Sequence, residues 1–188
     1  MHTAFKEWAV VVDALGHGSQ VLTLRKGGIA EGRGGFRAEH SSFLFFPTLF
    51  HQQRNSVVPA AQQRFDGIQS TFPPADRVPM EYWAKITESR RLEHLSQALS
   101  LSGLHVWTEE TIKSRFEWGR EEAIWLLALR VHRLPEPLEL PMLPGYGGCK
   151  SWIELAVDVP IEGSRPVLSD AAWTAQMNEI DARLHRPA

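Results

Sequence analysis

Apolar residues in this chain fall into runs whose composition and spacing predict strands in the first quarter of the sequence. Segments 8–15 and 21–26 are rich in β-branched and large apolar residues, and the GHGS stretch between them supplies turn residues. This pattern predicts a β-hairpin. Segment 36–47 predicts one or two further strands that end at Pro47, because proline cannot donate a hydrogen bond to a sheet.

The middle of the chain changes character. Residues 49–79 are polar and interrupted by prolines, which predicts a largely irregular, mobile excursion with short helices near 50–55 and 60–65. We expect that a protein partner, if the protein has one, binds through residues 55–79. Strand character returns over Met80–Thr87.

Helical periodicity appears next. Leu92, Leu95 and Leu99 recur at helical spacing, and Gly103 follows as a stop. A second helix is predicted after Thr108, whose side chain suits an N-cap.

The last third of the chain combines apolar runs with one amphipathic segment. The run 122–134 is compatible with a buried strand or a buried helix; the extended, proline-rich residues 134–141 favour a strand. Residues 149–160 predict a final strand. A closing amphipathic helix is predicted over about 169–185, with Ser169 or Asp170 as its cap.

The order of these elements shows no regular strand–helix–strand alternation, which argues against a doubly wound parallel sheet. We therefore predict an α+β fold with a mixed or antiparallel sheet, curled into a small barrel, and flanking helices. The length of 188 residues suits one domain over 1–188, with its core at about 4–160.

Composition narrows the classes of partner and compartment. The chain is 43% hydrophobic and 22% charged, with a net charge of −2, so it should be globular, and nucleic-acid binding would need a local basic patch. The single cysteine, Cys149, excludes an internal disulfide and favours a reducing compartment. The N-terminal residues lack the pattern of a signal peptide, and no apolar run is long enough to span a membrane. We expect a cytoplasmic protein that does not enter a membrane.

The stretch LRKGGIAEGRGGFRAEH, residues 24–40, combines cations with glycines. Glycine allows backbone N–H groups to approach a ligand closely, and arginine adds forked donors, so an anion cradle is predicted. The alternative is a plain hairpin loop with solvated charges. A histidine follows the next strand end, where functional groups often gather. The predicted anion- or nucleic-acid-binding residues are Arg25, Lys26, Gly27, Gly28, Arg33 and His51.

Catalysis is a second hypothesis. Metal-assisted hydrolysis of a phosphodiester would use Glu31, Glu39 and His40 as the candidate catalytic residues. No HxH, HExxH or CxxC spacing is present, so the sequence predicts no resident metal site, and it carries no cofactor fingerprint.

Four blocks carry a resemblance to a known family: AFKEWAVVVDALGHGSQVLTLRKGGIAE, FLFFPTLFHQ, ALRVHRL and YGGCKSWIEL. They resemble the bacterial domain-of-unknown-function family 1802 over about residues 4–159. Members of that family are sometimes joined to a restriction-endonuclease-like domain, which implies an association with restriction-type DNA systems. The resemblance implies no established activity.

A second resemblance is to PUA-like barrels of the ASCH and EVE type. ASCH domains carry a Gly-x-Lys-x-x-Glu-x-Arg motif, which Lys26, Glu31 and Arg33 approximate with two extra residues between lysine and glutamate. The resemblance implies binding of a nucleotide, a modified base or RNA. The sequence therefore favours a nucleic-acid- or nucleotide-binding module; the alternatives are the hydrolase and an accessory subunit that binds another protein.

Overall fold

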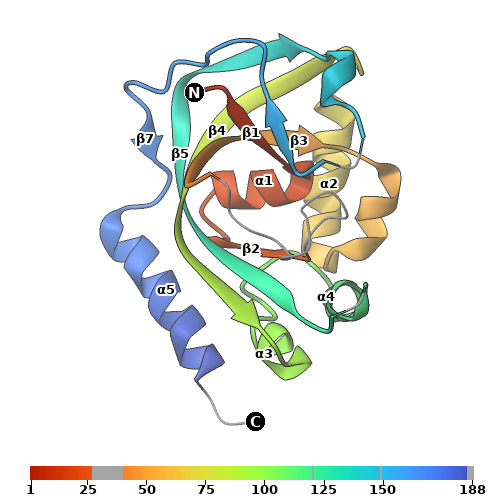
Figure 1. Cartoon of the computed structure of the whole chain (residues 1–188), viewed down its shortest axis with the longest axis vertical. Helices are drawn as coiled ribbons and strands as arrows, with labels where there is room; N and C mark the ends of the chain where they lie inside the picture. The colour runs from red at the N-terminus through yellow and green to blue at the C-terminus, as the bar shows by residue number, and fades with distance from the viewer. Residues whose placement is uncertain (27–39, 120, 149, 186–188) are drawn as a thin grey trace.

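The computed structural model of the chain describes residues 1–26, 40–119, 121–148 and 150–185 (Figure 1). In chain order, the described elements are β1 (Thr3–Trp8), α1 (Ala9–Gly16), β2 (Leu22–Arg25), β3 (Ser42–Thr48), the 3-10 helix η1 (His51–Ser56), α2 (Pro59–Thr71), β4 (Arg77–Leu92), α3 (Leu95–Ser100), α4 (Glu109–Glu117), β5 (Ile124–Pro141), η2 (Pro144–Tyr146), β6 (Trp152–Glu154), β7 (Arg165–Pro166) and α5 (Asp170–Leu184).

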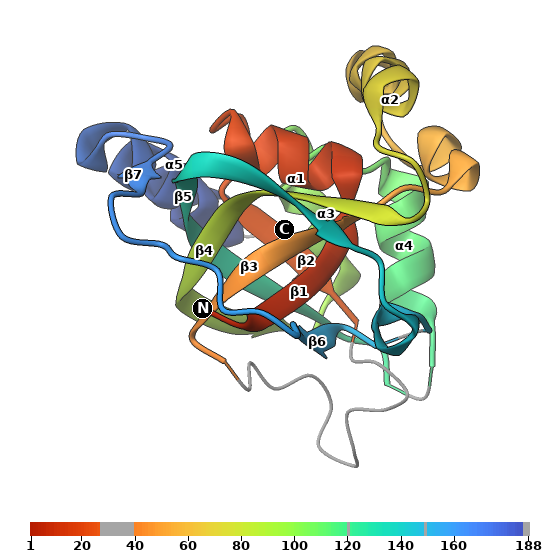
Figure 2. The same ribbon diagram turned by 90° about the horizontal axis from the view of Figure 1, so that it is seen from above.

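The strands form one mixed sheet in the order β2-β5-β4-β3-β1-β6, with β7 paired to β5. Strands β1 and β3 run parallel, whereas the other pairs are antiparallel. Figures 1 and 2 show the sheet curling around α1, with α2, α3, α4 and α5 outside the curve. The predicted α+β class, with a mixed, curled sheet and flanking helices, is therefore confirmed.

Helix α1 is the main departure from the predicted elements. Segment 8–15 was expected to be a strand of a hairpin; instead, β1 leads directly into α1 at Ala9. Every residue of this helix is buried except Asp13, which is partly exposed. A helix that is apolar around nearly its whole circumference loses the polar face that would distinguish it from a buried strand. Its three consecutive valines therefore misled the sequence prediction.

The second correction concerns residues 49–79, which are mostly helical rather than irregular. The short helix expected near 50–55 is confirmed as η1, and the one expected near 60–65 belongs to the longer α2. Pro59 begins α2 at a position where its missing N–H costs nothing. Phe65 anchors the helix because its side chain is fully buried.

Most predictions for the C-terminal half are confirmed. Thr108 caps α4 by accepting a hydrogen bond from the Thr111 N–H at 3.2 Å, and Ser169 caps α5 in the same way. The apolar run after residue 123 is the strand β5. Helix α3 starts later than predicted, because Leu92 ends β4. The predicted final strand is only the three-residue β6, and β7 follows it.

Two apolar clusters cover opposite faces of the sheet. Phe43 and Phe45 point into the curve, toward α1, whereas Leu44 and Phe46 belong to the cluster on the other face. Since successive residues of a strand alternate between faces, the unbroken apolar run of β3 reflects burial on both sides. Among the described residues, no helix is long and apolar enough to cross a membrane.

Candidate anion-binding site

Charged side chains meet inside the curve of the sheet, where β2 faces β1. The Thr23 hydroxyl donates a hydrogen bond to Glu7 Oε2 at 2.8 Å, and Arg25 Nη1 lies 3.6 Å from the same oxygen. Arg25 Nη2 also donates to Ser151 Oγ at 2.9 Å, just before β6. Strands β2 and β6 are the two edge strands of the sheet. The hydrogen bond between Arg25 and Ser151 therefore connects two edges that share no backbone hydrogen bonds among the described residues.

Strand geometry explains why these side chains converge. Residues two apart on a strand point to the same face, so Glu7 follows Phe5 into the curve and Arg25 follows Thr23. The main-chain N–H of Trp8 adds a hydrogen bond to Glu7 Oε1 at 2.9 Å, at the point where β1 becomes α1. The Glu7 side chain is completely buried, and it is satisfied by three donors or cations.

Arg115 brings a second guanidinium from α4. Its Cζ lies 4.6 Å from the Trp8 ring centroid and 4.7 Å from that of Trp107, and its Nη1 donates to the Leu24 carbonyl at 3.1 Å. Burial lowers the pKa of Arg115 to about 10; the Glu7 carboxylate opposes this shift and the Arg25 charge adds to it. Arg115 therefore stays charged at neutral pH. We call Glu7, Thr23, Arg25, Arg115 and Ser151 the barrel-mouth cluster.

The barrel-mouth cluster holds more positive than negative charge, because it contains two guanidiniums and one carboxylate, and that carboxylate forms an ion pair with Arg25. Arg25 retains the capacity for another hydrogen bond, since its buried Nε has no partner among the described residues. Its side chain is 19% exposed and its Cζ lies 4.6 Å from the Phe5 ring centroid. A charged guanidinium that is partly accessible to solvent is suited to binding an anion.

Aromatic rings extend this site toward solvent. The partly exposed Trp152 ring lies 4.7 Å from Phe5 and 5.3 Å from Phe43, between ring centroids. His40, a predicted catalytic candidate, meets the edge of the same ring at 5.2 Å, and its Nε2 lies 4.0 Å from a Glu154 carboxylate oxygen. The structure thus brings His40 close to aromatic and acidic side chains beside the barrel-mouth cluster.

The predicted pair of Arg25 and Lys26 separates, because consecutive strand residues point to opposite faces. Lys26 Nζ donates to the Phe116 carbonyl at 2.6 Å and to the Glu121 carbonyl. The Phe116 carbonyl belongs to the last turn of α4, where unpaired carbonyls attract cations. Burial lowers the Lys26 pKa, and Glu121 opposes that shift. An anion bound by Lys26 would have to replace these hydrogen bonds.

The other predicted residues are distributed as follows. His51 is exposed at the start of η1 and lies beyond the end of β3 that is opposite to His40. At about 3.3 Å per residue, β3 separates the two histidines by roughly 20 Å or more, so they do not share a site. Outside the described residues lie Gly27, Gly28, Glu31, Arg33 and Glu39.

The hydrolase hypothesis therefore remains a prediction. Two of its three candidates, Glu31 and Glu39, fall within 27–39, and the part of the chain that the structure describes contains no group of three or more acidic, histidine or cysteine side chains placed to hold a metal ion.

Sequence reasoning missed Glu7, Thr23 and Arg115 as members of a charged cluster, yet one signal pointed toward it. A glutamate interrupts the apolar strand AFKEW, and buried carboxylates need partners.

The curled mixed sheet and the charged cluster where β2 faces β1 define an α+β barrel-like protein with a candidate anion site. The chain belongs to the family described as Domain of unknown function (DUF1802), whose profile matches residues 4–179. The resemblance seen in the sequence is thus confirmed. No curated protein matches the chain.

Solved structures with a similar arrangement include ASCH from Zymomonas mobilis, at 12% identity and a TM-score of 0.46, with 94% of this chain and 92% of that chain covered. A mutant of the same protein aligns at 13% identity and a TM-score of 0.47, covering 81% of this chain and 87% of that chain. The predicted likeness to ASCH domains agrees with these neighbours. At such scores it says nothing about ligands or activity.

Proposed function

We propose that the protein binds a nucleotide or a single strand of nucleic acid through a phosphate held at the barrel-mouth cluster. The observation that carries this proposal is the unequal charge of the cluster: Glu7 forms an ion pair with Arg25, and the buried Arg115 guanidinium adds a second positive charge with no carboxylate of its own in the cluster. An incoming phosphate would supply the second negative charge. Arg25 is the contact residue, because its guanidinium is charged and its side chain is 19% exposed.

Trp152 supports a nucleotide rather than a bare anion as the ligand. Its ring is partly exposed beside Arg25, and stacking of a base on an aromatic ring contributes about 1–3 kcal/mol. The Gly-rich residues 27–35 follow Arg25 directly in the chain. Their predicted role as backbone donors to the ligand, together with Arg33, belongs to this proposal. A bound strand would pass the site with one phosphate on Arg25 and one base on Trp152.

Fluorescence anisotropy with labelled single- and double-stranded RNA and DNA at low salt tests the proposal. We expect the single strands to bind best, and Arg25→Gln to lower their affinity about tenfold while reducing the slope of log K against log salt by about one, as for one lost phosphate contact. The matched control is Arg165→Gln, which removes an equal charge from exposed β7 and should leave binding unchanged.

Arg25 contacts buried Glu7, so thermal unfolding of the variant must accompany the binding curves. Trp152→Phe keeps an aromatic ring and should retain most binding, whereas Trp152→Ala should lose it. Equal affinities of the wild-type protein and a folded Arg25→Gln variant would refute the assigned site. Absence of binding to all four nucleic acids and to free nucleotides at millimolar concentration would refute the function.

A further inference from the structure

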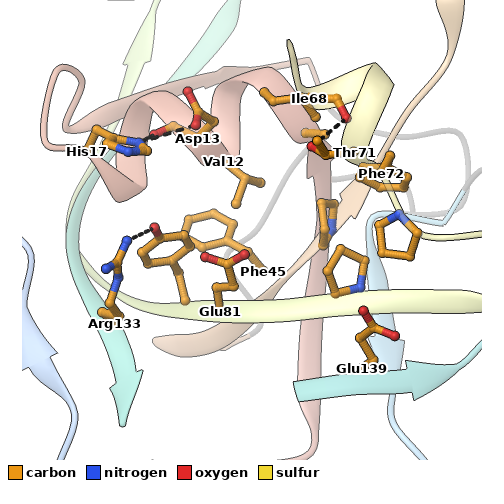
Figure 3. A pocket seen from close by; sticks show the side chains of 15 residues that line it. Val12, Asp13, His17, Phe45, Ile68, Thr71, Phe72, Glu81, Arg133 and Glu139 are labelled. Atoms are coloured by element: carbon orange, nitrogen blue, oxygen red, sulfur yellow. Dashed lines mark hydrogen bonds and ion pairs between the residues drawn. The ribbon is translucent and has the colours of Figure 1, made fainter. Parts of the chain in front are cut away.

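A cavity of about 390 Å³ opens beside α1 (Figure 3). It opens between α1, the end of α2 and the strands β3, β4 and β5. Apolar side chains form about half of its wall: Ala9, Val12, Phe45, Pro47, Ile68, Phe72, Pro73 and Pro79. This volume is within the usual range for pockets that bind small organic molecules.

Two carboxylates at this cavity have no described partner. Glu81 of β4 points into the cavity and Glu139 of β5 stands at its rim in Figure 3. Neither of them forms a hydrogen bond or ion pair with a described residue. Both side chains are exposed, so their charges remain hydrated and are available to a ligand.

The cations of this region are already engaged. Arg133 Nη2 donates to the Tyr82 hydroxyl oxygen at 2.7 Å, and this hydrogen bond raises the Arg133 pKa, with the Glu81 charge adding to the shift. The third acidic residue, Asp13, receives two hydrogen bonds from Arg64, at 2.6 and 3.0 Å. The charges of Asp13 and Arg64 balance each other. The remaining carboxylates, Glu81 and Glu139, outnumber the one guanidinium, Arg133, so the cavity has an excess of negative charge.

We propose that this cavity binds a small organic cation, an ammonium group carried on an apolar or aromatic body. The ammonium would lie between Glu81 and Glu139, and the body would pack on Phe45, Ile68 and the prolines. Among the described lining residues, an anionic ligand would have Arg133 and His17 to pair with, and it would face both carboxylates. The cavity shares no residue with the barrel-mouth cluster, so the inference stands apart from the proposed nucleotide site.

Three probes with the same aromatic body and different charges test this inference: 2-phenylethylammonium, the neutral 2-phenylethanol and the anion phenylacetate. Titrations are followed by protein-observed NMR and calorimetry on the whole chain. We expect the ammonium to bind at least tenfold more tightly than the alcohol, with phenylacetate weakest. Amide shifts should be confined to α1, the end of α2, β3, β4 and β5.

The double variant Glu81→Gln/Glu139→Gln should lower ammonium affinity at least tenfold and leave the affinity for the alcohol unchanged. Its matched control is Glu110→Gln, which removes a carboxylate from an exposed position in the first turn of α4, among residues that do not line the cavity. Both variants alter exposed side chains and should fold normally. The proposal is overturned if the three probes bind equally, if phenylacetate binds best, or if the ammonium gives no shifts at these elements up to 10 mM (about the weakest binding worth assigning a site).

Discussion

The barrel-mouth cluster and the cavity beside α1 both place carboxylates near guanidinium groups, but they differ in burial. Glu7 is fully buried, whereas Glu81 and Glu139 are exposed. A buried charge loses its hydration and depends on its partners, so removing one partner is costly. An exposed charge keeps its hydration and costs little to remove. Substitutions in the barrel-mouth cluster should therefore change both ligand binding and the free energy of unfolding. Substitutions of the exposed carboxylates at the cavity should change binding alone.

The largest expected effect comes from removing Glu7. Glu7→Ala removes the ion-pair partner of Arg25 and the nearby carboxylate charge that favours the protonated form of Arg115, and breaking a buried pair in this way typically costs about 3–5 kcal/mol. We expect the free energy of unfolding, measured by urea denaturation, to fall by that amount. Glu81→Ala, on the cavity side, should change it by no more than about 0.5 kcal/mol.

Equal losses of unfolding free energy in Glu7→Ala and Glu81→Ala would show that burial does not distinguish the carboxylates of the two regions. If Glu7→Ala proves too unstable to purify, Glu7→Gln offers a second measurement, because it keeps hydrogen-bonding atoms for Thr23 and the Trp8 N–H while removing the charge. A loss below about 1 kcal/mol in Glu7→Gln would show that hydrogen bonding, not charge balance, is the main role of Glu7.

The next largest effect concerns pH. His105 is 5% exposed, and burial lowers its pKa to about 4, with the charge of Arg115 acting in the same direction. In the unfolded chain the pKa would be near 6.5. Between these values the unfolded state binds a proton that the native state excludes, so stability is lost as pH falls from about 6.5 to 4. The loss attributable to His105 is about 3 kcal/mol.

Urea denaturation of wild type and His105→Leu at pH 7 and pH 4 measures this contribution. Other groups, such as Asp66 in its ion pair with Arg54, also respond to acid, so the relevant quantity is the difference between the two proteins. We expect the stability of His105→Leu to fall about 3 kcal/mol less than that of wild type over this interval. Parallel pH dependence would show that His105 is protonated in the native state.

The sequence predicted the fold better than it predicted the candidate site. The α+β class, β5 and the caps of α4 and α5 followed from local signals: apolar runs and hydroxyl side chains before helices. Helix α1 did not, because an almost fully buried segment has no polar face to reveal its period. The cluster was harder still, since Glu7, Arg25 and Arg115 are distant in sequence and meet only when the sheet curls. Their pairing depends on tertiary packing, which no local pattern encodes.

The smallest expected effect concerns side-chain packing beside the cavity rather than charge. Gly16, at the end of α1, lies so close to Tyr82 that an added Cβ would come within 2.4 Å of the ring carbon Cζ. Gly16→Ala must therefore displace the ring, and overpacking of this kind costs about 1–3 kcal/mol. The displaced phenol should also lose its hydrogen bond from Arg133.

A double-mutant cycle with Tyr82→Ala isolates this contact, because Gly16→Ala should cost little once the ring is gone. We expect a coupling of about 1–2 kcal/mol by urea denaturation. Additive losses in the double variant would mean that Gly16 is required for the end of α1 itself, independently of its contact with the Tyr82 ring.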